Sequence, residues 1–164
     1  MSTPGPSRTL VVLRHGKSDW SGAHPDRDRP VGDRGRRQAA AAGAWLAEHL
    51  PTIDAAVVSP AQRTRTTWEL VAAELADPPE AVLDERLYGG WGEGLLGVVR
   101  DLPPQAGTAL LVGHNPGVED LVELLTGTWV DLPTASLAVV DLDVAWRQAG
   151  RATGRVRTSG RPPA

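Results

Sequence analysis

Three short polar motifs in the sequence each follow an apolar run, and together they contain two histidines and two arginines. Arg14 and His15 end the first run, His114 follows another, and Arg63 lies one helical turn beyond the end of a third. Two imidazoles and two guanidinium groups at one place would form an anion site of high charge density. A phosphoryl group is the simplest ligand for such a site, because each planar guanidinium can bind two of its oxygens.

The apolar runs before these motifs are short and rich in β-branched residues, which is typical of buried strands. They alternate with longer segments in which apolar residues recur at helical spacing. This alternation predicts an α/β fold with a mostly parallel sheet flanked by helices. Ligands of such sheets bind at the carboxyl ends of the strands, where the three motifs are expected to converge. The strands are expected at 9–13, 55–58, 81–83, 108–112 and 137–142.

The helices between these strands have recognisable ends. Ser59 is expected to act as the N-cap of the second helix, with Gln62 completing a capping box. Gly127 is expected to end the last helix, since glycine is common just after a helix C-terminus. The helices are expected at 33–50, 59–76, about 95–101 and 115–127.

The composition is that of an ordinary globular domain. The chain has 164 residues, of which 41% are hydrophobic and 23% are charged, and this predicts one domain over residues 1–164. The ends, at about 1–8 and 158–164, are expected to be flexible, and 150–164 is expected to hold one short edge strand.

Most of the aromatic residues are tryptophan, because the chain contains six Trp, one Tyr and no Phe. Trp45 and Trp68 lie in helical patterns and are expected to pack in the core. Trp20 and Trp91 lie in loops and are the candidates for an exposed position at the rim of the pocket.

Several kinds of chemistry are excluded or disfavoured. The absence of cysteine excludes disulfides, thiolate metal sites and cysteine nucleophiles, and it is compatible with a reducing compartment. The four histidines lack metal-site spacing, and no P-loop, dinucleotide fingerprint or serine-hydrolase elbow is present. We therefore expect no metal and no cofactor. Without a secretory signal or a membrane-length apolar run, we expect a cytoplasmic protein with no membrane partner.

The net charge of −3 is unevenly distributed, because the last 18 residues contain five Arg and no acidic residue. The rest of the chain is acidic, which argues against nucleic acid as a partner. The C-terminal arginines are expected to be solvated, with a contact to an anion as the alternative.

The order of the motifs resembles a known family. The segments LRHG at 13–16, SPAQRTRTT at 59–67 and VGHNP at 112–116 are similar to the motifs of the histidine phosphatase (phosphoglycerate mutase-like) superfamily. More narrowly, RHGKSDW at 14–20, DRP at 28–30, RLY at 86–88 and LPT at 132–134 resemble the SixA-type phosphohistidine phosphatases. The resemblance runs from about residue 9 to 146 and implies a three-layer α/β/α sandwich.

The resemblance also implies roles for the polar residues. His15 would be the nucleophile of a phosphatase, forming a phosphohistidine intermediate that water then hydrolyses. Arg14, Arg63 and His114 would hold the phosphoryl oxygens in the transition state without a metal. Two further residues would be secondary contacts to the substrate, with packing or helix capping as the alternative: Ser18 and Asn115.

A proton donor for the leaving group is harder to identify. Glu85 is the candidate general acid, since its surroundings loosely resemble the stretch that carries the acid in mutase-like branches; the alternative is a surface carboxylate beside Arg86. A phosphohistidine substrate needs less help than a phosphate ester, because imidazole is a better leaving group than an alkoxide.

The substrate class follows from the space above the pocket. Only about 50 residues separate Arg63 from His114, too few for the helical insertions that cover the pocket in mutase and sugar-phosphatase relatives. An open pocket favours phosphohistidine on a protein, and we expect a monomer. The alternatives are a phosphatase of small phosphomonoesters or nucleotides, and a noncatalytic phosphoprotein-binding module. A mutase would need a second phosphate site, which the sequence does not reveal.

Overall fold

A six-stranded sheet forms the centre of the computed structural model, which describes residues 7–164. β1 pairs in parallel with β4, β4 with β2, and β2 with β3, whereas β5 and β6 run antiparallel to their neighbours. The order across the sheet is β3-β2-β4-β1-β5-β6. The strands are β1 (Arg8–Arg14), β2 (Ala55–Val58), β3 (Ala81–Leu83), β4 (Thr108–Gly113), β5 (Leu137–Leu142) and β6 (Gly154–Gly160).

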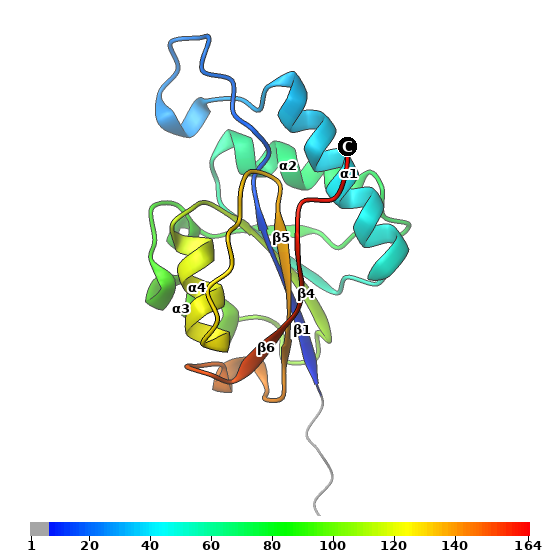
Figure 1. Cartoon of the computed structure of the whole chain (residues 1–164), viewed down its shortest axis with the longest axis vertical. Helices are drawn as coiled ribbons and strands as arrows, with labels where there is room; N and C mark the ends of the chain where they lie inside the picture. The colour runs from blue at the N-terminus through cyan, green and yellow to red at the C-terminus, as the bar shows by residue number, and fades with distance from the viewer. Residues whose placement is uncertain (1–6) are drawn as a thin grey trace, which may run out of the picture.

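Helices cover both faces of this sheet, as Figure 1 shows. One layer contains α1 (Asp33–His49) and α2 (Gln62–Ala72), and the other contains α3 (Gly92–Arg100) and α4 (Gly117–Thr126). Short 3-10 helices lie at Asp26–Asp28, Glu85–Leu87 and Trp146–Gln148. Within residues 7–164, no helix is both long and apolar enough to cross a membrane. The predicted three-layer α/β/α fold is confirmed.

The two faces of the sheet are filled by alternate residues of the four inner strands, β1, β2, β4 and β5, because successive side chains of a strand point in opposite directions. In β1, Leu10 and Val12 pack with the helices α3 and α4. Val11 and Leu13 pack with α1 and α2 on the other face. The near-continuous apolar runs of the sequence reflect this burial on both sides.

The start of α2 differs from the prediction. Its first residue is Gln62, and the position before it, Ala61, makes no capping bond through its side chain. The Thr64 hydroxyl donates to the backbone carbonyls of Ser59 and Ala61, which ties the turn together without a capping box. The helix ends at Ala72 rather than near residue 76. The Ser59 side chain is therefore available for another contact.

The C-terminal segment is more regular than expected. β6 extends over seven residues to Gly160, and Arg157 forms an ion pair with Asp141 on the neighbouring strand at 2.6 Å. At the other end, β1 already includes Arg8. Arg8 and residues 158–160 therefore belong to the sheet rather than to flexible ends, because their backbone groups pair with β5. Residues 1–6 lie outside the described part of the chain.

The loop after β1 packs closely against the first turn of α1. A Cβ atom on Gly16 would lie 2.4 Å from the carbonyl oxygen of Gly35, and a Cβ on Gly35 would lie 2.2 Å from the carbonyl oxygen of Lys17. The Gly16 amide also donates to the Thr67 hydroxyl at 3.0 Å, and that hydroxyl donates to the Arg63 carbonyl. The two glycines and this threonine fix the loop that carries His15.

Replacing Gly35 with alanine is expected to lower the free energy of unfolding by about 1–3 kcal/mol, because the new methyl group would overlap backbone atoms. Gly94→Ala in α3 is the matched control, since nothing lies within 4 Å of a Cβ at that position. The control change is expected to leave stability unchanged or to raise it by up to about 1 kcal/mol. Urea unfolding of the two variants measures the difference, and equal destabilisation would contradict the close packing.

Candidate active site

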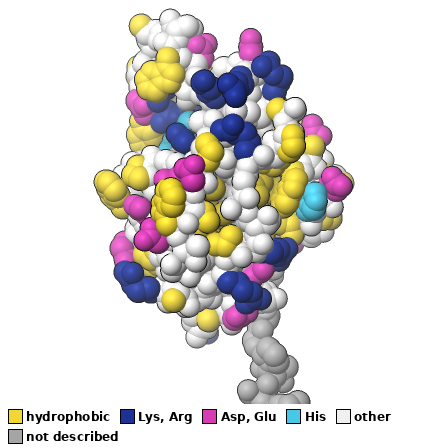
Figure 2. Space-filling model, viewed as in Figure 1, with side chains coloured by type: hydrophobic (Ala, Val, Ile, Leu, Met, Phe, Trp, Pro, Cys, Tyr) yellow, Lys and Arg dark blue, Asp and Glu magenta, His cyan; other side chains and the backbone are white. Residues whose placement is uncertain are grey.

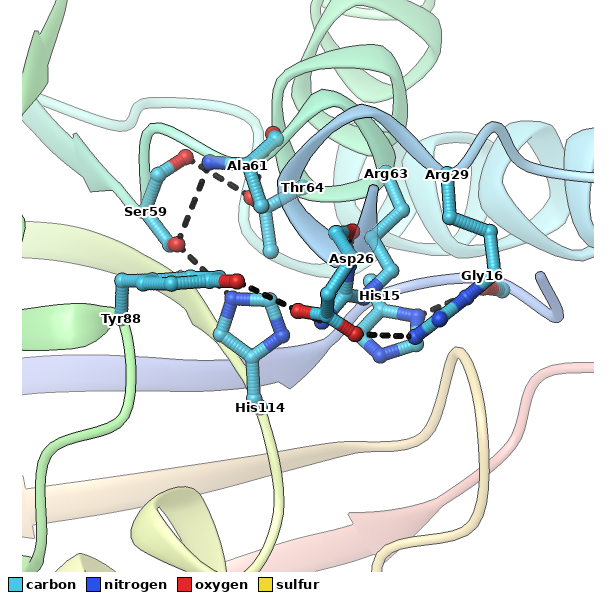
Figure 3. Close-up of polar contacts among 10 residues, drawn as sticks. All are labelled: His15, Gly16, Asp26, Arg29, Ser59, Ala61, Arg63, Thr64, Tyr88 and His114. Carbon is cyan, nitrogen blue, oxygen red and sulfur yellow. Dashed lines mark hydrogen bonds and ion pairs between the residues drawn. The ribbon is translucent and has the colours of Figure 1, made fainter. Parts of the chain in front are cut away.

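The polar motifs at the ends of β1, β2 and β4 converge on one pocket of about 420 Å³. His15 and His114 lie there with their ring centroids 5.3 Å apart. Figure 3 shows the two imidazoles together with the Arg63 side chain from α2. The pocket is lined by Arg14, His15, Lys17, Ser18, Trp20, Arg29, Arg34, Gln38, Arg63, His114, Asn115, Thr134 and Arg161. The predicted convergence is confirmed.

His15 is held in one orientation by the backbone. Its Nδ1 lies 2.7 Å from the carbonyl oxygen of Gly16. A carbonyl can only accept a hydrogen bond, so Nδ1 carries the proton and the lone pair of the ring lies on Nε2. The pKa of His15 is lowered to about 4, mainly by burial and also by Arg63 and Arg14, while the Gly16 carbonyl acts in the opposite direction. The imidazole is only 7% exposed and is neutral near pH 7.

His114 is oriented by the serine that was expected to cap a helix. The Ser59 hydroxyl lies 2.7 Å from Nε2 of His114 and also accepts a bond from the Ala61 amide. When this hydroxyl donates to Nε2, the ring proton lies on Nδ1. That nitrogen is buried and has no hydrogen-bond partner within residues 7–164. The pKa of His114 is lowered to about 3, mainly by burial and then by His15 and Arg63.

Arg63 and Arg14 are buried to different extents. Arg63 is 6% exposed, which is rare for a guanidinium without a compensating charge. Arg14 donates to the Leu132 carbonyl at 3.2 Å, and its Nε is buried without a partner in the described structure. Burial lowers the pKa of Arg14, although the side chain remains charged near neutral pH. Both side chains are held in place and retain N–H groups for a ligand.

The positive charge of Arg63 is compensated by Asp26, which the sequence did not indicate as a site residue. Asp26 accepts from Arg63 through its backbone carbonyl at 2.7 Å and its side chain at 3.2 Å. Arg29 and the Tyr88 hydroxyl bind the same carboxyl group (Figure 3). These partners hold the pKa of Asp26 at about 2, with Tyr88 as the largest cause. Asp26 is thus ionised near neutral pH and cannot serve as a proton donor.

The secondary contacts and the candidate general acid differ in position. Ser18 and Asn115 line the pocket, and the Asn115 side-chain amide donates to the Leu132 carbonyl at 2.8 Å. Glu85 does not line the pocket. Its carboxylate is 70% exposed and paired with Arg27 at 2.8 Å, and this contact lowers its pKa. The structure therefore does not bring Glu85 to the reacting groups, because Arg27 holds it at the surface.

The tryptophans also differ in position. Trp20 is 73% exposed and lines the pocket, with the Arg29 guanidinium stacked 3.5 Å above its ring. Trp91 is exposed as expected but lies on a separate hollow beside α4. Trp68 is buried in the core, and Trp45 is partly buried against it.

Comparisons with known proteins identify the family. The model of the histidine phosphatase superfamily (branch 1) matches residues 10–107. The chain belongs to this superfamily. An uncharacterised Mycobacterium tuberculosis protein, Rv1276c, is 36% identical over 135 residues, which cover 82% of this chain and 77% of that protein. A 2,3-bisphosphoglycerate-dependent phosphoglycerate mutase of Rhizobium etli is 32% identical over 127 residues, covering 63% of this chain and 60% of the mutase.

Solved structures refine this assignment. A structure from Nakamurella multipartitia assigned to phosphohistidine phosphatase SixA has a TM-score of 0.86 and 31% identity, covering 99% of this chain and 100% of that one. The protein histidine phosphatase SixA complexed with tungstate has a TM-score of 0.82 and 25% identity, covering 94% of this chain and 97% of that one. The resemblance to SixA-type members is confirmed, and the protein is a phosphatase of this superfamily.

The His15 imidazole is expected to titrate near pH 4 in phosphate-free buffer, because burial opposes its protonation. Between pH 4 and the ordinary value of 6.5, the unfolded chain binds a proton that the folded chain does not. The free energy of unfolding should therefore fall as the pH drops through this window. NMR titration of the ring nitrogens measures the pKa, with His15→Asn to assign the signal. Titration near pH 6.5 would contradict the burial argument.

Ser59→Ala is expected to lower kcat/KM for phosphate release about tenfold, since His114 loses the bond that fixes its ring proton. The nitrogen chemical shifts of His114 should also show a smaller population of the Nδ1–H form. Ser136→Ala is the matched control, because the buried Ser136 hydroxyl has no partner among the described residues. Equal activities of the two variants, with an unchanged His114 spectrum, would exclude a positioning role for Ser59.

Proposed function

We propose that this phosphatase hydrolyses phosphohistidine on a protein, without a metal, through a phosphohistidine intermediate on His15. The observation that carries the proposal is the neutral His15, whose Nδ1 proton is bound to Gly16 and whose Nε2 has no partner among the described residues. A neutral imidazole with a free lone pair, next to two arginines, is an activated nucleophile for phosphorus.

The reaction takes two displacement steps. Nε2 of His15 attacks the phosphorus, the new P–N bond forms, and the bond from phosphorus to the leaving group breaks with its electron pair on the leaving group. Water then attacks the phosphorus of the intermediate, the P–Nε2 bond breaks, and its electron pair returns to Nε2. The proton that water loses passes to the released phosphate or to solvent.

Charge on the phosphoryl oxygens is stabilised by groups already in position. Arg14 and Arg63 supply N–H donors, and the Nδ1–H of His114 supplies another from a buried site. Donors fixed before the reaction stabilise the transition state without reorganisation. Arg63 uses one hydrogen of each terminal nitrogen for Asp26, which leaves further hydrogens for the phosphoryl group.

The leaving group supports phosphohistidine as the substrate. Among the described residues, no Asp or Glu lines the pocket, and Glu85 is paired with Arg27 at the surface. A phosphorylated imidazole that carries a proton on its other nitrogen leaves as neutral imidazole, so it does not require an acid from the protein. An alkoxide leaving group would require one.

The surroundings of the pocket support a protein as the carrier. Between Arg63 and His114 the chain forms only α2, β3, one 3-10 turn, α3 and β4, so this stretch contains no additional helices. An open site can admit a phosphorylated side chain on a folded surface. The SixA structure in complex with tungstate is described as a protein histidine phosphatase, and the likeness extends over 94% of this chain.

A turnover comparison tests the proposal. Phosphate release is measured in EDTA from a phosphohistidine-bearing protein and from a panel of small phosphomonoesters and nucleotides. We expect kcat/KM to be at least a hundredfold higher for phosphohistidine, because the pocket lacks a proton donor for alkoxides.

His15→Asn is the matched variant and is expected to remove turnover while keeping phosphate binding. Higher kcat/KM for small phosphomonoesters would contradict the substrate assignment. Binding of phosphoprotein without turnover by the unmodified chain would instead identify a binding module. Turnover by His15→Asn would exclude His15 as the nucleophile.

A further inference from the structure

The pocket carries more positive charge than one phosphoryl group needs. Six cationic side chains line it, and no described Asp or Glu does: Arg14, Lys17, Arg29, Arg34, Arg63 and Arg161. Asp26 offsets one of these charges, and a bound phosphoryl dianion offsets about two more. Glu119 and Asp131 act on Arg14 from outside the pocket lining. The site therefore keeps a net positive charge that is available to other parts of the substrate.

The excess charge lies on three residues at the mouth of the pocket, which we name the cationic rim: Lys17, Arg34 and Arg161. All three are exposed, and within residues 7–164 none forms an ion pair with a carboxylate. Arg29 and Arg63, by contrast, are both tied to Asp26. Figure 2 shows Lys and Arg side chains gathered in the upper part of the face in view.

The rim residues come from separate segments and place further positive charge beside the phosphoryl site. Arg34 lies in the first turn of α1, where the helix dipole disfavours a positive charge. Arg161 follows β6 and is held over the site by a bond from its Nε to the Thr134 carbonyl at 2.8 Å. Three uncompensated cations from separate segments thus surround the phosphoryl site. External anions could therefore bind beside this site.

We propose that the cationic rim binds acidic side chains that flank the phosphorylated residue of the partner protein. This inference rests on the proposed function, since it names the surface that presents the phosphohistidine. Arg161, one of the C-terminal arginines, would then contact an anion of the partner. Such a contact is the alternative to the solvated position expected from the sequence.

The exposure of the rim favours a protein surface over a second phosphate group on a small molecule. A compact second phosphate would be held by convergent, desolvated donors, as the first is by Arg63 and His114. The rim instead extends into an adjoining hollow of about 510 Å³, which shares Lys17, Ser18, Trp20 and Arg34 with the pocket. Such a spread and solvated set of charges suits several carboxylates around a phosphorylated side chain.

The same hollow limits where the acidic groups can lie. Asp19 and Asp33 also line this hollow, so the hollow would repel carboxylates placed near them. The acidic residues of the partner are therefore expected within a few positions of the phosphorylated residue. The exposed Trp20 ring adds an apolar contact on this side.

A charge-matched comparison tests the rim. The double variant Arg34→Gln/Arg161→Gln is compared with Arg36→Gln/Arg37→Gln, which removes the same charge from exposed positions of α1 outside the pocket. The substrates are two phosphohistidine peptides of equal length, one flanked by Glu and one by Gln. The readout is the ratio of kcat/KM for the Glu peptide to that for the Gln peptide.

We expect the unmodified enzyme to prefer the Glu peptide roughly tenfold at low salt, and the rim variant to lose most of this preference through a higher KM. The control variant should keep it, and added salt should weaken it. If the loss of the Arg161 bond disturbs folding, seen as a lower melting temperature, Lys17→Gln/Arg34→Gln replaces that variant.

The outcomes separate this inference from the proposed function. Failure of the unmodified enzyme to hydrolyse either peptide would contradict the proposed function itself. Equal hydrolysis of both peptides, or an equal effect of the control variant, would contradict the proposed binding of acidic side chains by the cationic rim. The proposed function would not be affected. If the rim variant lowered kcat/KM only for a small bisphosphorylated ester, the rim would be a second phosphate subsite. This result would also contradict the proposed binding of acidic side chains.

Discussion

The site depends on one constraint, which is that an imidazole must stay neutral and correctly oriented beside two arginine side chains. Burial of His15 and the positive charges of Arg14 and Arg63 disfavour its protonation. The Gly16 carbonyl then decides which nitrogen carries the single ring proton. A strong anion site and a reactive lone pair can therefore share one pocket, where a protonated imidazole would bind phosphate but could not attack it.

The rest of the fold keeps this geometry in place. The parallel strands bring His15 and His114 to one edge of the sheet, and the close approach of Gly16 and Gly35 fixes the loop after β1. Thr67 connects this loop to the helix that carries Arg63. The edge strand β6 places Arg161 over the same pocket, so segments at both ends of the chain contribute to one site.

The features that the sequence predicts best are those with a strong local signal. The four inner strands, β1, β2, β4 and β5, were predictable because their residues are buried on both faces, and the convergence of Arg14, His15 and His114 follows from parallel pairing. The edge strand β3, with Val82 and Leu83 exposed, was recognisable only as a short apolar run. Asp26 could not be found in this way, because its contacts with Arg63 and Tyr88 join segments 37 and 62 residues away. Ser59 matched a local capping pattern, yet its hydroxyl binds His114 across the sheet edge. Glu85 was a candidate by local resemblance, but its ion pair with Arg27 holds it at the surface.

The most direct measurement is to identify the ring nitrogen that carries the phosphoryl group in the proposed intermediate. The phosphoenzyme is trapped by rapid quenching under alkaline conditions, and phosphorus–nitrogen couplings are measured on protein with labelled histidine. We expect phosphorylation of His15 at Nε2, because Nδ1 is occupied by its bond to Gly16. A phosphoryl group on Nδ1 of His15, or on His114, would contradict this expectation.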